Sequence, residues 1–66
     1  MTNVIVPREI IVERVVRPEG WFLVIMEDGA GNELYSGVWE CRELALADAE
    51  DLKRTYGPAV IREATR

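Results

Sequence analysis

Residues able to carry out catalysis are scarce in this chain. It contains no histidine, so it lacks the side chain that most often acts as a general base near neutral pH. Its single cysteine, Cys41, stands just before a predicted helix, and a helix N-terminus can lower the pKa of a thiol. The simpler interpretation of Cys41 is a half-buried residue at the capping position. We therefore predict that the protein is not an enzyme, with a thiol enzyme or redox sensor that uses Cys41 as an alternative.

The segment Asp28-Gly29-Ala30-Gly31-Asn32 is the other place where a ligand site has to be considered. It offers oxygen ligands, but it lacks the spacing of ligands along a calcium-binding loop. Its two glycines are not followed by a predicted helix, so they do not form a phosphate-binding loop. With one cysteine and no histidine, a zinc site is not expected either. We predict no metal and no cofactor, and interpret this segment as a tight turn.

Tight turns and changes in hydrophobic period divide the chain into five elements. We predict strands at about residues 9–17, 21–27, 33–38 and 59–63, and a helix at about 42–56. Pro18 and Gly20 suit a turn over residues 17–20, and Gly57 followed by Pro58 ends the helix. The prediction is a single α+β domain over residues 1–66. Its order is β-β-β-α-β, an antiparallel meander sheet with one helix packed on one face, and Val4-Ile5-Val6 can add an edge strand.

The predicted helix has a narrow apolar stripe of small residues. Ala45, Ala49, Leu52 and Tyr56 recur at helical spacing, so the helix can approach the sheet closely. We expect large residues to fill the gap from the sheet side: Trp21, Phe22, Leu23, Ile25 and Leu34. Alternation along the strands does not settle which face is buried. The far face of so small a sheet is expected to be exposed to solvent or bound to a partner.

Charge is distributed unevenly along the 66 residues. The net charge is only −4, but residues 19–51 contain nine acids and one base, a net charge of −8. Such a stretch argues against direct binding of nucleic acid. Carboxylates on neighbouring strands, ~4.8 Å apart, and on alternate strand residues, ~6.6 Å apart, resemble the spacing of DNA phosphates. One interpretation is an acidic face that binds a protein in place of DNA; the other is an ordinary solvated surface.

The candidate partner-binding residues are eight of the nine acids of this stretch and one aromatic residue that can act as an apolar anchor. They are Glu27, Asp28, Glu33, Trp39, Glu40, Glu43, Asp48, Glu50 and Asp51. The longest purely apolar run, Trp21 to Met26, is too short for a membrane helix, so no membrane association is predicted. An N-terminal export signal is not visible, and a lone cysteine cannot form an internal disulfide. A cytoplasmic location is therefore expected.

In its small size, its acidic stretch Glu19–Asp51 and its lack of catalytic residues, the chain resembles the small phage-encoded anti-CRISPR proteins of the DNA-mimic kind. The resemblance implies a stoichiometric inhibitor in the cytoplasm of a bacterial host cell. Its partner would be a subunit of a type I CRISPR effector, type I-C in particular, whose basic DNA-binding surface it blocks. We expect a monomer rather than a homodimer. The alternative is a small bacterial accessory or regulatory domain, unrelated to nucleic acid, that binds through an apolar sheet face.

Overall fold

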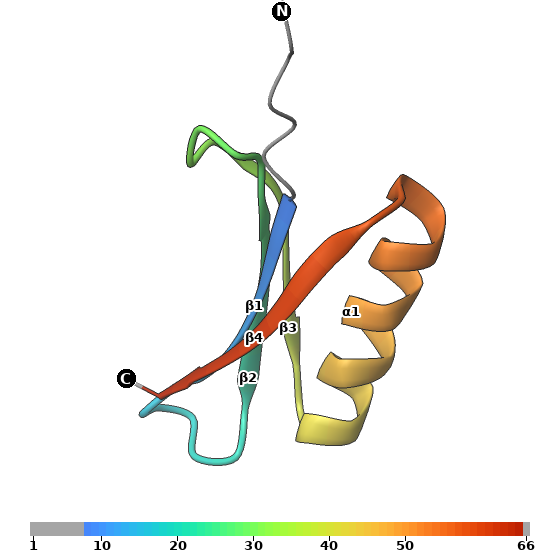
Figure 1. The fold of residues 1–66 in the computed structure, drawn as a ribbon. Coiled ribbons are helices and arrows are strands. Elements are labelled where there is room, and N and C mark those ends of the chain that lie inside the picture. Colours follow the sequence, from blue (N-terminus) through green and yellow to red (C-terminus); the bar gives the residue numbers. More distant parts are fainter. Residues whose placement is uncertain (1–7, 66) are drawn as a thin grey trace, which may run out of the picture.

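Segments rich in β-branched and aromatic residues form the sheet, and the alanine-rich segment forms the helix. The computed structural model describes residues 8–65 (Figure 1). Its elements are β1 (Arg8–Arg14), β2 (Phe22–Glu27), β3 (Glu33–Trp39), α1 (Arg42–Tyr56) and β4 (Ala59–Thr65). The predicted α+β fold with the order β-β-β-α-β and one helix on one face of the sheet is confirmed. The predicted edge strand Val4-Ile5-Val6 lies outside the described residues.

The four strands form one mixed sheet in the order β3-β2-β1-β4. The antiparallel meander of β1, β2 and β3 is confirmed, but the prediction of a wholly antiparallel sheet is wrong, because β4 runs parallel to β1. The helix explains the difference. Its 15 residues span about 22 Å, close to the ~23 Å length of a seven-residue strand. The helix therefore returns the chain to the end of the sheet at which β3 began, so β4 runs in the same direction as β3 and β1 (Figure 1).

The first hairpin differs slightly from the prediction. β1 ends at Arg14 rather than near residue 17, because the following residues belong to a wider connection closed by a hydrogen bond from Val15 N to Trp21 O. Within it, Trp21 N donates to Pro18 O, so the tight turn covers residues 18–21, one residue later than predicted. Gly20 stands third in that turn with a φ of +86°, which is the place where such turns need a glycine.

The core lies between α1 and the sheet. Ile10 and Val12 of β1 and Val24 and Met26 of β2 are buried against the helix. On the helix, the predicted stripe of Ala45, Ala49 and Leu52 is buried, as expected. Tyr56 is 53% exposed, so its place in the stripe was wrong. Helix α1 contacts β1, β2 and β3, whereas its last turn leads the chain away toward β4.

The sheet-side residues of the core differ from those expected. Phe22 packs against the core as predicted, but Leu23, Ile25 and Leu34 point to the opposite face, so that prediction was wrong. The reason is strict alternation along the strands. Because Met26 pairs with the buried Ile10, every second residue from Phe22 to Met26 faces the helix, and the residues between them face away. Trp21, in the connection before β2, is half-buried.

Candidate functional site

The turn between β2 and β3 contains one of the predicted partner-binding acids, Asp28, which holds the turn together; two others, Glu27 and Glu33, flank it at the ends of the strands. Asp28 Oδ1 accepts hydrogen bonds from Ala30 N and Asn32 N, both at 2.9 Å. Asp28 Oδ2 accepts one from the side-chain amide of Asn32 at 3.0 Å. These bonds lower the pKa of the Asp28 carboxyl, chiefly through the Asn32 side chain. Asp28 therefore organises the turn, in which Gly31 takes a φ of +87°.

At the same end of the sheet, three carboxylates lie in a row across neighbouring strands. Glu27 of β2 is the register partner of Glu9 on one side and of Glu33 on the other. We call Glu9, Glu27 and Glu33 the acidic row. Adjacent strands are ~4.8 Å apart, so like charges are held close together, an arrangement that weakens a sheet. Within the described residues Arg62 offsets part of this charge, through an ion pair of 2.9 Å from its Nε to Glu9 Oε1.

Trp39 and Asp48, two other predicted site residues, contact each other. Asp48 Oδ2 accepts hydrogen bonds from Trp39 Nε1 and from the Tyr35 hydroxyl, each at 2.8 Å. The pKa of the Tyr35 hydroxyl is raised, first by its hydrogen bond to Asp48 and then by burial, so it remains a donor. Gly37 makes room for this arrangement, because a Cβ at that position would lie 2.7 Å from the Tyr35 oxygen. The three side chains fix α1 to β3, a role that the sequence analysis did not foresee.

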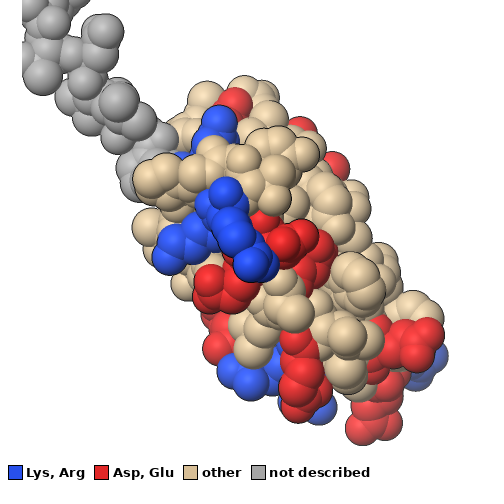
Figure 2. Space-filling model, turned by 90° about the vertical axis from the view of Figure 1, so that its right-hand side faces the viewer, with Lys and Arg blue, Asp and Glu red and all other residues tan. Residues whose placement is uncertain are grey.

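The remaining predicted acids lie along the helix side of the molecule. Glu40 and Glu43 are exposed where β3 leads into α1, at the opposite end of the sheet from the acidic row (Figure 1). The seven residue-to-residue steps from Glu33 to Glu40 span about 23 Å of extended chain. Glu50 and Asp51 are exposed further along α1, and Asp51 Oδ1 pairs with Arg54 Nη2 at 2.9 Å. The predicted acids are thus divided between the two ends of the sheet and the helix. On the helix side, basic side chains lie among the acidic ones (Figure 2).

The face of the sheet opposite the helix is largely apolar at its centre. Two neighbouring rows of paired residues cross this face from β4 to β3. One row is Arg62, Ile11, Ile25 and Ser36, and the other is Ala64, Glu13, Leu23 and Val38. We call the apolar side chains of this side the open face; they are Ile11, Leu23, Ile25, Leu34, Val38 and Val60. No described element covers them: Val38 is 57% exposed, Val60 54% and Leu34 49%. The acidic row borders this face at one end.

None of the residues of the open face was among the predicted site residues, although the sequence contained a signal for this face. Five consecutive residues of β2, Phe22 to Met26, are apolar, a pattern typical of a strand buried on both faces. Helix α1 covers one of those faces, and no other element of the described residues covers the opposite one.

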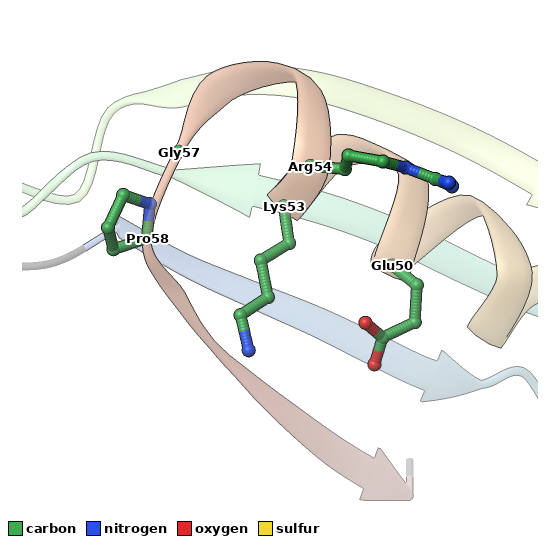
Figure 3. A pocket seen from close by; sticks show the side chains of 5 residues that line it. All are labelled: Glu50, Lys53, Arg54, Gly57 and Pro58. Carbon is green, nitrogen blue, oxygen red and sulfur yellow. The ribbon is translucent and has the colours of Figure 1, made fainter.

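Two open hollows flank the helix. One is lined by Glu50, Lys53, Arg54, Gly57 and Pro58, where Glu50 and Lys53 project side by side toward β4 and Arg54 points elsewhere (Figure 3). The other lies on the β3 side, and we call it the helix–strand groove. It is lined by Trp39, Leu44, Ala47, Asp48, Asp51 and Arg54.

Cys41 is half-buried at the N-cap of α1, and its side chain makes no capping hydrogen bond. Residues 8–65 contain no group of three side chains placed to hold a metal ion. The helix in this part of the chain is neither long nor apolar enough to cross a membrane.

In comparisons with known proteins, no protein-family model, no curated protein and no solved structure matches this chain.

Proposed function

We propose that this protein is a non-enzymatic binding module that docks its open face on another protein. The observation that carries the proposal is β2, which is apolar on both faces while α1 covers only one of them. An uncovered apolar patch with a polar border is typical of a protein–protein interaction site. Its centre, formed by Ile11, Leu23 and Ile25, lies on the two central strands, where a partner can exclude water most completely.

The charges around the open face indicate the chemistry of the partner. The charged residues in the two rows of the open face and in the acidic row at its border are four acids and one base: Glu9, Glu13, Glu27, Glu33 and Arg62. A second copy of the chain would bring these acids together, and each copy has a net charge of −4. A different protein, with an apolar patch bordered at one end by Lys or Arg, would instead relieve the repulsion within the acidic row. We therefore assign the open face to such a partner.

Affinity capture with two matched charge variants tests this proposal. Ile25→Lys places a charge at the centre of the open face, and Thr55→Lys adds the same charge at an exposed position of α1. We expect one captured protein to be retained by the wild type and by Thr55→Lys but lost by Ile25→Lys. A set of captured proteins that is unchanged by Ile25→Lys would overturn the proposal. So would sedimentation showing that the chain pairs with itself through this face.

A second candidate is the inhibitor of a type I CRISPR effector expected from the resemblance, acting in the bacterial cytoplasm by DNA mimicry. The observation that favours it is the acidic row, because three glutamates on neighbouring strands, which lie ~4.8 Å apart, offer a line of negative charge to a basic surface. The two candidates differ in what releases the partner. Double-stranded DNA and high salt would release a partner held by mimicry, whereas a partner held by the apolar centre of the open face would be retained.

A further inference from the structure

Strand β3 forms one edge of the sheet, and no other strand of residues 8–65 lies on its outer side. In the part of the chain that the structure describes, its residues make no backbone hydrogen bond outside the sheet. The backbone N–H and C=O groups that point away from β2 are therefore available to another extended segment. An edge of this kind is a template for the addition of a strand.

This edge lacks the features that usually protect edge strands. Residues 34–39 contain no charged residue and no proline, and three of them, Leu34, Tyr35 and Trp39, are large and apolar or aromatic. The other edge strand, β4, contains Arg62 and Glu63, and charges on an edge discourage pairing. A register irregularity between Met26 and Glu27 affects only the start of β3, and pairing is regular from Tyr35 to Trp39. The unprotected edge is therefore the one beside the helix–strand groove.

The groove offers a specific environment to the side chains of an added strand. Its apolar part is formed by Trp39, Ala47 and the 49% exposed Leu44. Its acidic part is formed by Asp48 and Asp51. Asp48 uses Oδ2 for both of its hydrogen bonds, and Oδ1 accepts none within residues 8–65. The ion pair of Asp51 with Arg54 is exposed on both sides, so it can exchange for a pair with another cation.

We propose that the edge of β3 and the helix–strand groove bind an extended peptide segment as a fifth strand. Alternate side chains of such a strand, ~6.6 Å apart, point to the groove side. An apolar side chain packs on Trp39 and Leu44, and a Lys or Arg side chain pairs with Asp48 Oδ1 and Asp51. Main-chain hydrogen bonds give the affinity in this mode of recognition, and the pockets for alternate side chains give the specificity. This site goes beyond the proposed function, since the groove and the open face lie on opposite sides of the sheet.

A synthetic peptide of seven residues with blocked ends tests the inference. It has Leu, Arg and Arg at its second, fourth and sixth positions and threonine at the others, so the three side chains share one face when it is extended. We expect it to slow hydrogen exchange of backbone amides in residues 34–39 and to shift the indole resonance of Trp39. A control peptide with the same side chains but with every backbone nitrogen methylated cannot donate hydrogen bonds to the strand and is expected not to bind.

Two protein variants with the same change in charge locate the contact. Asp51→Lys alters the groove, whereas Glu50→Lys alters the hollow on the β4 side of the helix (Figure 3). We expect Asp51→Lys to weaken binding of the peptide about tenfold and Glu50→Lys to change it less than about twofold. The inference is overturned if both variants weaken binding equally, if the N-methylated peptide binds as well, if the protected amides lie in β2 rather than β3, or if no binding is measured.

Discussion

Replacing Asp48 with alanine removes the single oxygen that accepts hydrogen bonds from both Tyr35 and Trp39. A hydrogen bond to a charged group contributes about 1.5–3 kcal/mol to stability, and the lower end applies to this half-buried cluster. The Asp48→Ala variant is therefore expected to lose about 2–3 kcal/mol of unfolding free energy. Asp48→Asn keeps a neutral acceptor and should lose about half as much.

The effect is large for a chain of this size. The hydrophobic core of a chain of fewer than about 70 residues supplies roughly 3–5 kcal/mol of unfolding free energy. Asp48→Ala would therefore remove about half of the stability. In a domain of 60–100 residues, each kcal/mol shifts the melting temperature by about 4–8 °C. The expected fall in melting temperature is thus about 10–20 °C.

Urea and thermal unfolding followed by far-ultraviolet circular dichroism measure this loss without relying on the fluorescence of Trp39. Asp51→Ala is the matched control on the same helix, because its exposed ion pair with Arg54 should contribute less than about 0.5 kcal/mol. A double-mutant cycle of Asp48→Ala with Tyr35→Phe should give a coupling of about 1 kcal/mol. If Asp48→Ala costs no more than Asp51→Ala, or if the coupling is zero, the cluster does not fix α1 to β3.

Three further predictions concern the same strands and turn. Gly37→Ala should cost about 1–3 kcal/mol of unfolding free energy, because the new Cβ would lie 2.7 Å from the Tyr35 oxygen. Urea unfolding measures this cost, which should largely disappear in a Tyr35→Ala background. Because the folded state raises the pKa of Tyr35 above its ordinary value of 10.0, the stability that this group contributes should be constant below that pH and fall as pH rises above it. Unfolding midpoints between pH 8 and 11 check the slope, which Tyr35→Phe should reduce; an equal slope would contradict the assignment. The lowered pKa of Asp28 has the opposite sign, so stability should fall as pH drops through its ordinary value of 3.8, and Asn32→Ala should weaken that dependence in acid melts.

The order and type of the elements could be predicted from the sequence, because local signals specify them. The alanine-rich helix with its Gly57 stop, and the turn organised by Asp28, depend on residues close together in the chain. The direction of β4 could not be predicted in this way. It depends on how far α1 travels relative to the length of the sheet, a property of two elements together.

The candidate site was predicted only in part, for a related reason. Acids were chosen from their density between residues 19 and 51, but density does not reveal which carboxylates the fold uses internally. Asp28 and Asp48 accept hydrogen bonds within the molecule, and their part in binding a partner stays a prediction. Glu9 lies outside the acidic stretch, yet the sheet brings it beside Glu27. The apolar run of β2 was the signal for the open face, but the run alone does not say which of its two faces the helix covers.

Site-specific cross-linking tests the central claim, that the open face binds another protein, most directly. A photoreactive amino acid in place of Ile25 reports on the centre of the open face, and the same group in place of Thr55 reports on the outside of α1. The account predicts that the probe at Ile25, and not the probe at Thr55, becomes linked to one other protein, at a segment that combines apolar residues with Lys or Arg. Links formed equally from both positions, links to a second copy of the chain, or no links from Ile25 would contradict it.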